Sequence, residues 1–533
     1  MNYFQPYSLP LDDALVAAWD SQLAELAESP ILAQAVAKRS ADLFPRFAAC
    51  YAQLRALPRG TRRALQRRLA RAGELSELLP GWQRKLAQSL AGAALLLALA
   101  QSAQAATITV HAKTPPDLIP GDGKCSLIEA IINANNDDQS GSTDCAAGSG
   151  ADTIVLPAKK TITLTSSYSY QYSSDTGLPA ITSAITIEGN GGKIVRGASG
   201  AVFRLMAVSS SGNLTLRNVT LSGGNSSVSG GAVFNNGSLT IEHSTISGDA
   251  ASERGGGVMN YTNGTLRIES STLSGNQAVR GGAVFNDKNG ATTTITNSTI
   301  SGNSVDYGGG GVMNDALSSV TIRSSTISGN HSGYYGGGVM NYGEFTIENS
   351  TISGNTAKTG GGGIYNDYFV HDSITTEGTV TINNSTIVGN TVTPGFGGGI
   401  RNEGILNLNR SLISGNHGNF GNEIYHNTAF TGSVTADNFN LFGVGNSPGV
   451  EGFAPGATDI VPAVALAQIV GPLKNNGGAT FTHALMPGSP ALDAAPVDSD
   501  CPANDQRGIT RPQGGGCDVG AFELQPKGKK KGK

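Results

Sequence analysis

Charged residues are scarce in this chain: they make up 14% of its 533 residues, whereas glycine alone contributes 73. So little charge, with heavy use of Ser, Thr and Asn, argues against helical bundles and favours short strands joined by turns. Residues 1–105 carry 12 Lys and Arg against 8 Asp and Glu, and residues 106–533 carry 24 against 32. A mildly acidic main part without a basic face argues against nucleic acid as a partner.

Cysteine and histidine are also sparse, with five and seven copies. Neither shows the spacing of metal ligands, so the sequence predicts no metal and no cofactor. Apart from Cys50, the cysteines form two close pairs, Cys125 with Cys145 and Cys501 with Cys517. Two disulfides, each closing a loop of roughly 15–20 residues and worth about 3 kcal/mol, are the favoured interpretation, and four reduced thiols are the alternative. Disulfides predict an oxidising compartment.

One almost wholly apolar run, residues 86–100, follows a basic pair and precedes Ala103-Gln104-Ala105. Residues 84–105 are therefore expected to be an export signal cleaved after Ala105, since a membrane span needs about 20 apolar residues. The helical, Arg-rich residues 1–83 would be lost with the signal. Alternatively, they stay in the cytoplasm while residues 86–105 anchor the chain uncleaved, or the start site is assigned too far upstream. The main part is predicted to be exported from a bacterium, to the medium or the cell surface.

A repeat with a step of mostly 25–27 residues organises the centre of the chain. Its clearest element is Ser-Thr-Ile-Ser-Gly-Asn, which begins at Ser298, Ser325 and Ser350 and has variants at Val219, Ser244, Ser271, Ser385 and Ser411. Aligned repeats give three ladders in which all 24 positions are apolar, as Ile322, Ile327 and Val339 are in one repeat. One step of 35 residues holds an insertion, roughly residues 368–378, that should project as a loop.

One repeat cannot bury its apolar side alone, so neighbouring repeats must stack. Stacking pairs each strand with its equivalents at about 4.8 Å, and parallel strands joined by crossovers take a right-handed path. The sequence thus predicts an all-β, right-handed parallel β-helix, a pectin-lyase-like solenoid, over residues 152–445, with three strands per coil that each bury one ladder residue. A short amphipathic helix in residues 106–151 should cap the first coil. Residues 446–524 would form a separate C-terminal region, and residues 525–533 a basic tail.

Two polar columns accompany the apolar ladders. Stacked amides can hydrogen-bond along the coil axis, which predicts a structural ladder of Asn235, Asn260, Asn286, Asn314, Asn341, Asn366 and Asn402, with His426 in the eighth place. A glycine column is expected to form left-handed turns at Gly223, Gly248, Gly275, Gly302, Gly329, Gly354, Gly389 and Gly415.

A stripe of large side chains precedes the Gly-Gly corners of successive coils. Its members are Arg254, Arg280, Tyr307, Tyr335, Thr359, Phe396 and Phe420. Stacking would align them about 4.8 Å apart, where rings and guanidinium groups could hold an extended glycan or peptide. The alternative is that these residues only stack on one another to stiffen the corner.

Paired acids, the signature of polysaccharide-cleaving β-helices, are not evident. Asp287, Asp315 and Asp367 share the position after the Asn ladder, but on coils that are not all adjacent. Catalysis on a glycan needs two carboxylates, or a carboxylate with a base, on one face. The sequence therefore predicts no catalytic residues.

Segments near both ends resemble known bacterial families. Residues 125–135 resemble the CSLREA domain, with Ile128 where that pattern has Arg. Residues 473–523 closely resemble the choice-of-anchor Q domain, and the Gly-Gly-Ala-Val-Phe-Asn runs at Gly230 and Gly281 resemble the repeat of chlamydial polymorphic outer-membrane proteins. These resemblances imply a surface-exposed or secreted β-helix and supply no catalytic residues.

The sequence as a whole predicts a non-catalytic secreted or cell-surface β-helix protein that acts in adhesion, matrix or envelope contact. The expected partner is an extracellular glycan or a cell-surface component, with membrane contact only through residues 86–105 if they stay uncleaved. The alternative is a polysaccharide lyase or glycoside hydrolase acting on an extracellular glycan. An autotransporter passenger would need a C-terminal barrel and is disfavoured.

Overall fold

The computed structural model describes residues 105–111, 121–197, 201–371 and 374–526. The chain divides into two units, Met1–Ala103 and Gln104–Lys533, and the described residues belong to the second. The predicted helical extension and Cys50 lie outside the described residues, as do all but the last residue of the export segment and most of the basic tail.

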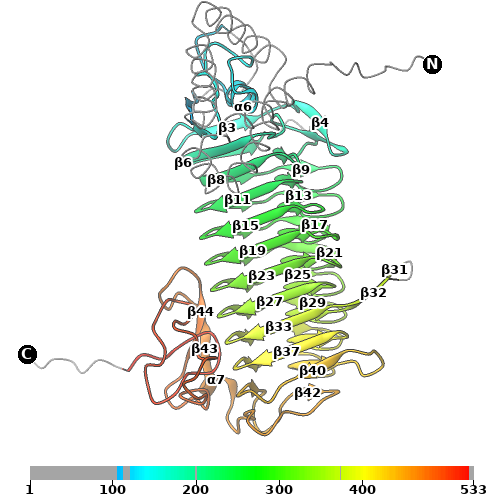
Figure 1. Cartoon of the computed structure of the whole chain (residues 1–533). Helices are drawn as coiled ribbons and strands as arrows, with labels where there is room; N and C mark the ends of the chain where they lie inside the picture. The colour runs from blue at the N-terminus through cyan, green and yellow to red at the C-terminus, as the bar shows by residue number, and fades with distance from the viewer. Residues whose placement is uncertain (1–104, 112–120, 198–200, 372–373, 527–533) are drawn as a thin grey trace, which may run out of the picture. The chain divides into compact units, whose positions relative to one another are not determined.

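The described part is a parallel β-solenoid (Figure 1). Its strands form a 21-stranded sheet, a 10-stranded sheet and a 7-stranded sheet, here called sheets 1, 2 and 3. Sheet 1 holds both the first and the second strand of each coil, because two long strands, β6 (Ala184–Arg196) and β8 (Asn213–Ser222), run through the corner and join the two ladders.

Six of the eight regular coils have four separate strands rather than the three that the sequence predicts. In one coil these are β11 (Ser238–Glu242), β12 (Thr245–Ser247), β13 (Ala250–Ala251) and β14 (Val258–Asn260). The additional strand β13 belongs to sheet 3, and its equivalents are only two to five residues long. Such short segments carry no alternation of polar and apolar residues that a sequence could display.

A left-handed turn separates the second strand from the additional one. The glycines predicted for this column all have positive φ, from 63° to 73°. A Cβ at Gly248 would meet nothing within 4 Å. Backbone conformation therefore explains these glycines. Space is limiting only at Gly415, where a Cβ would lie 2.4 Å from Leu466 Cδ2.

The core is a single column of apolar side chains inside the coils. The first strand buries two residues rather than one, for example Leu239 and Ile241, which are both fully buried. Alternate residues of a strand point to the same side, so a five-residue strand can send two inward. Thr293 is the polar exception in the Leu239 column, and its hydroxyl donates to Asn286 Oδ1 at 2.8 Å.

A helix closes the N-terminal end of this core. Helix α6 (Leu127–Asn136) begins at Ser126, whose Oγ accepts from the Glu129 N–H while Glu129 Oε2 accepts from the Ser126 N–H. Its buried apolar residues join the core of the solenoid, as expected. The first strand of sheet 1, β1 (Thr107–Thr109), precedes this helix and pairs with β2 (Asp152–Val155), so the solenoid begins inside the segment assigned to the cap.

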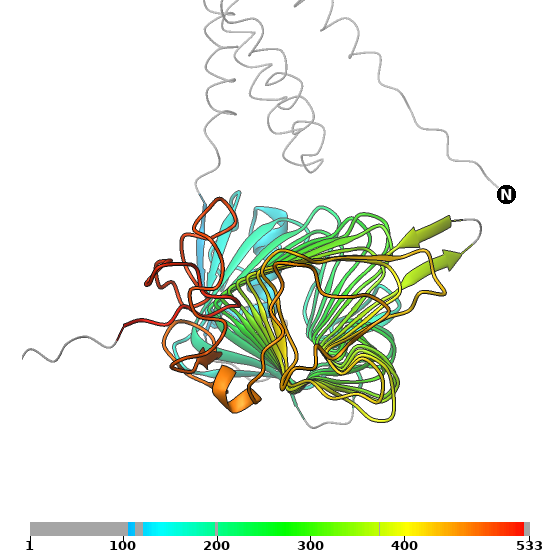
Figure 2. The same cartoon turned by 90° about the horizontal axis from the view of Figure 1, so that it is seen from below.

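Both predicted cysteine pairs form disulfides, Cys125 with Cys145 and Cys501 with Cys517. The insertion in the long repeat is an antiparallel hairpin of β31 (Tyr368–His371) and β32 (Ile374–Glu377). Figure 2 shows this hairpin projecting from the solenoid wall.

The C-terminal region contains α7 (Leu466–Ile469), β43 (Val470–Lys474) and β44 (Thr482–Leu485). Its buried apolar residues form one cluster with Val388, Leu412 and Leu441 of the solenoid. This C-terminal module lies beside the lower coils (Figure 1), on the outer side of the second strands. There Thr351 Oγ1 donates to Gln506 Oε1 at 2.6 Å, and Ser353 Oγ lies 2.8 Å from His483 Nε2. The outward Thr and Ser of the repeat thus hold the module.

Candidate functional site

The outer face of sheet 2 is apolar although it points away from the core. The first and third residues of each strand face inward, so the middle residue faces outward. These middle residues form a buried row of Ala207, Phe234, Met259, Phe285, Met313, Met340 and Tyr365. Since the row is buried, other side chains must cover it, and these include Tyr172, Tyr307, Tyr335 and Tyr342.

The Asn ladder lies on the inner side of the same strands. Each of the first six asparagines donates from Nδ2 to Oδ1 of the next at 2.7–2.9 Å, and Asn402 Nδ2 lies 3.1 Å from His426 Nδ1. All seven asparagines are fully buried. Their amides are therefore used within the coils and face no ligand.

A second amide ladder was missed by sequence reasoning. It consists of Asn276, Asn303, Asn330, Asn355, Asn390 and Asn416, linked Nδ2 to Oδ1 at 2.9–3.0 Å. Asp249 stands at its upper end, and Glu423 accepts from Asn416 Nδ2 at 2.6 Å at its lower end. Burial raises the pKa of both acids, that of Glu423 to about 7. The sequence does carry a signal for this second ladder, because its members include the final Asn of each Ser-Thr-Ile-Ser-Gly-Asn element.

The predicted stripe lies along one edge of the outer face, but in a different register. Residues bridged from coil to coil are Ser229, Arg254, Arg280, Gly308, Tyr335, Gly360, Phe396 and Phe420. Tyr307 and Thr359 each come one residue before this column, and the pairing shifts between Ala278 and Arg280. Counted from the inward residues Val312 and Ile364, Tyr307 and Thr359 stand five positions upstream, whereas every bridged residue stands four positions upstream.

The two glycines in this column, Gly308 and Gly360, leave room for outward-facing side chains of the sheet 2 strands. A Cβ at Gly308 would lie 2.2 Å from Met340 Sδ, and one at Gly360 would lie 2.5 Å from Arg401 Cδ. Arg401 therefore rises through the gap at Gly360. Its guanidinium lies 5.8 Å from the Tyr335 ring centroid and 5.4 Å from that of Phe396, so Arg401 is a member of the stripe that the sequence did not indicate.

Members of the stripe contact one another and still present surface to solvent. The rings of Phe396 and Phe420 stack with centroids 5.1 Å apart, and Arg280 lies 4.6 Å over the Tyr307 ring. Tyr334 packs 6.2 Å from both Tyr307 and Tyr335. Tyr334 and Phe420 are each 51% exposed. Mutual stacking and ligand binding are therefore compatible here.

Most of the positive charge on this face is already paired. Arg254 lies 3.5 Å from Asp287 Oδ1, and Arg401 Nε donates to Glu403 Oε1 at 3.1 Å. Burial raises the pKa of Asp287, against the charge of Arg254. Among the described residues, Arg280 has no ion-pair partner.

Two carboxyl groups meet behind the stripe, at the base of the hairpin. Asn366 pairs with Asn402, so Asp367 and Glu403 follow in register on adjacent coils. Glu403 is 4% exposed and accepts from Tyr365 Oη at 2.9 Å and from Asn427 Nδ2 at 3.2 Å. Burial, then the charge of Glu403, raises the pKa of Asp367 to about 7. The sequence grouped Asp367 with Asp287 and Asp315 and missed Glu403, although Glu403 holds the same position after its asparagine.

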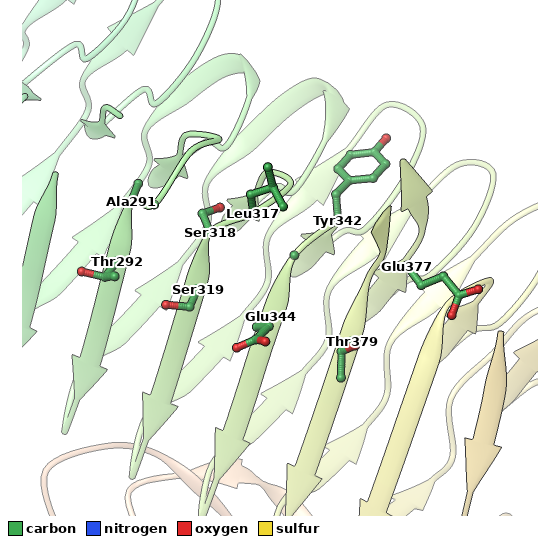
Figure 3. Close-up of a pocket in the computed structure, with 11 residues that line it drawn as sticks. Ala291, Thr292, Leu317, Ser318, Ser319, Tyr342, Glu344, Glu377 and Thr379 are labelled. Carbon is green, nitrogen blue, oxygen red and sulfur yellow. The ribbon is translucent and has the colours of Figure 1, made fainter. Parts of the chain in front are cut away.

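A groove of about 430 Å³ lies at the start of the first strands (Figure 3). It crosses β19 (Thr292–Thr296), β23 (Ser319–Arg323), β27 (Glu344–Glu348) and β33 (Thr379–Asn383). The groove is lined by hydroxyl groups, by the carboxylates of Glu344 and Glu377, and by Tyr342, and its lining contains no Lys or Arg. Burial, then the charge of Asp367, raises the pKa of Tyr342, and smaller contributions come from its hydrogen bonds to Asp367 and Tyr307. Tyr342 thus connects the groove with the stripe.

No protein-family model and no curated protein matches the chain. Among solved structures it is similar to the crystal structure of pectate lyase Pel9A, with a TM-score of 0.42 and 16% sequence identity. The match covers 78% of this chain and 96% of that one. The CSLREA and choice-of-anchor Q resemblances stay predictions.

Across the described ranges, no three His, Cys, Asp or Glu side chains are grouped to hold a metal ion. No helix in that part of the chain is long and apolar enough to cross a membrane.

Proposed function

We propose that this protein is an exported, non-catalytic β-solenoid that binds an extended, neutral glycan of a cell surface or matrix along the outer face of sheet 2. The observation that carries the proposal is the row of half-exposed rings formed by Tyr307, Tyr334, Tyr335, Phe396 and Phe420. Ring faces pack on the apolar faces of sugars, and the edge of each tyrosine ring supplies a hydroxyl.

The dimensions of the row suit a chain-like ligand. The coils that carry Tyr307 and Phe420 are four steps apart, which is about 19 Å at the spacing of parallel strands. A row of this length can contact several sugar units at once. A neutral glycan is favoured because Arg254 and Arg401 are paired with Asp287 and Glu403.

Cleavage of the glycan is the second candidate, because Asp367 and Glu403 form a carboxyl pair on adjacent coils. Glycoside hydrolysis needs two carboxyls about 5–5.5 Å apart with retention, or about 6.5–9.5 Å apart with inversion. Asp367 and Glu403 hydrogen-bond to one another, which is closer than either spacing. Glu403 is also occupied by Arg401, Tyr365 and Asn427. We therefore rank binding above cleavage.

Export rests on two features. Disulfides such as Cys125–Cys145 and Cys501–Cys517 persist in oxidising compartments and are rare in the cytosol. Residues 84–105 have the sequence of an export signal, although they lie almost wholly outside the described residues.

The test incubates the purified protein with neutral glycans (hydroxyethylcellulose, laminarin and dextran) and acidic ones (alginate and polygalacturonate). Both the affinity and the appearance of new chain ends are measured. We expect binding of at least one neutral glycan without new ends. Tyr334→Ala should weaken it by about 0.5–1.5 kcal/mol, or roughly two- to tenfold. Tyr170→Ala is the matched control, since Tyr170 is 69% exposed on the β4 (Ser169–Gln171) hairpin.

Release of new chain ends would replace the proposal with cleavage, and the Asp367–Glu403 pair would then be the first place to mutate. A failure to bind any glycan, or equal losses in Tyr334→Ala and Tyr170→Ala, would contradict the proposed surface.

A further inference from the structure

Arg401 connects the stripe to the carboxyl pair. Its guanidinium fills the gap at Gly360, between the rings of Tyr335 and Phe396. The same guanidinium donates to Glu403. The position of a stripe residue is thus fixed by a carboxyl group that itself contacts Asp367.

We propose that a proton shared by Asp367 and Glu403 holds Arg401 in the stripe, and that its loss above neutral pH weakens glycan binding. This inference concerns the regulation of the surface proposed above and rests on that proposed function. With one proton, the pair carries a single negative charge, which Arg401 balances. Without it, two carboxylates in contact face one guanidinium, and the excess charge is buried.

Excess buried charge can be relieved only by movement of the carboxylates or of Arg401. The arginine also packs 5.1 Å from the Tyr365 ring, in addition to its contacts with Tyr335 and Phe396. Movement of its side chain therefore removes a contact from three rings. The central part of the stripe would lose its arrangement, whereas its ends at Arg254 and Phe420 would not.

Among the residues that the structure describes, the groups around the pair supply no second cation. They come from several elements: Tyr342 after β26 (Val339–Asn341), Tyr365 on β30 (Ile364–Asn366), Arg401 on β36 (Ile400–Asn402), His426 at the end of β39 (Ile424–His426), and Tyr307 and Tyr335 on the stripe side. The Tyr342 hydroxyl hydrogen-bonds to Asp367, and His426 contacts the side chain of Asn402 rather than the pair.

Stability and glycan affinity are expected to fall as pH rises, because the pKa of Asp367 is raised in the folded protein. Burial, then the charge of Glu403, raises the pKa of Asp367 to about 7 from an ordinary value of 3.8. An acid whose pKa rises on folding costs stability progressively as pH increases from its unfolded to its folded pKa. The pair therefore keeps its proton predominantly below pH 7. If the glycan binds only the protonated form, its affinity should fall up to about tenfold between pH 6 and pH 8.

The experiment measures affinity of the full chain for hydroxyethylcellulose, laminarin and dextran at pH 6 and pH 8. We expect the fall in the wild type and none in Asp367→Asn, whose neutral amide cannot lose the proton. Asp315→Asn makes the same change in the same column away from the pair, and should keep the wild-type fall. A wild-type affinity that does not change between the two pH values overturns the inference, whatever the variants do.

A readout that needs no glycan separates the two proposals. The free energy of unfolding of Asp367→Asn relative to the wild type should increase from pH 4 to pH 7 and then level off. If no glycan binds at either pH, the proposed function fails and the inference about binding fails with it, while this stability profile still reports whether the pair holds a proton. Binding without pH dependence, by contrast, leaves the proposed function intact and removes only the inference.

Discussion

Replacing Asp249 with asparagine should stabilise the protein, because Asp249 occupies an asparagine position of the second amide ladder. In the interior of that ladder, Asn303 Nδ2 donates to Asn330 Oδ1 at 2.9 Å and to the Leu273 carbonyl at 3.1 Å. Asp249 is fully buried, and its Oδ2 has no hydrogen-bond partner. Burial raises the pKa of Asp249 well above its ordinary value.

The magnitude follows from the proton that the ladder requires. An aspartate can act as a donor only when it is protonated, and keeping a group of ordinary pKa about 3.9 protonated at pH 7 costs up to about 4 kcal/mol. Asp249→Asn removes this cost, since an amide donates without a proton from solvent. The gain should be close to zero near pH 4 and should grow by at most about 1.4 kcal/mol per pH unit above it.

The reverse substitution, Asn303→Asp, is the matched control in the same column. It should lose what Asp249→Asn gains, because the new carboxyl faces three acceptors, the carbonyls of Leu273 and Ser301 and Asn330 Oδ1. Urea unfolding of the wild type and both variants at pH 4, 5.5 and 7 measures the difference directly. A gain for Asp249→Asn that is the same at pH 4 and pH 7, or a loss at pH 7, would refute the protonated-ladder explanation.

Three further outcomes are expected. Gly360→Ala places a methyl group 2.5 Å from Arg401 Cδ, so glycan affinity should fall as far as it does in Arg401→Ala while the circular dichroism spectrum of the solenoid is unchanged. Gln506→Ala removes an amide that binds the C-terminal module to the coils. The hydrogen-bonding groups left unpaired should destabilise the docked module by about 1–3 kcal/mol, so limited proteolysis should release it faster. Cys501→Ser opens the loop closed by Cys517 and should cost about 3 kcal/mol of module stability, seen as a lower melting temperature under non-reducing conditions.

Sequence periodicity was most informative where every coil repeats the same contact. The inward ladder residues, the left-handed glycines and the Asn235–Asn402 amides each occur in every coil, so one alignment reveals all of them. The same alignment failed where a coil departs from the pattern. At Tyr307 and Thr359 the bridged residue is the following glycine, because the pairing shifts by one residue.

The candidate site depends mainly on such departures. Arg401 follows a column of apolar and tyrosine side chains and joins the stripe because Gly360 leaves a gap. Glu403 lies on the coil after the one that carries the hairpin, so 36 positions separate it from Asp367 in the sequence. The register of β30 with β36 nevertheless places the two residues side by side. Neither contact is visible to a method that compares equivalent positions.

The sequence by itself determined the solenoid, its coil length, its two disulfide pairs and one of its amide ladders, because stacking forces equal residues to share one environment. Only the tertiary structure decided where the C-terminal module lies, that Asp367 meets Glu403, and that Arg401 reaches the row of rings. These contacts join residues that are not equivalent in the repeat, and their geometry depends on strand register and on the space a missing side chain leaves. A periodic sequence specifies strand register strongly, but it carries no record of the space that a missing side chain leaves.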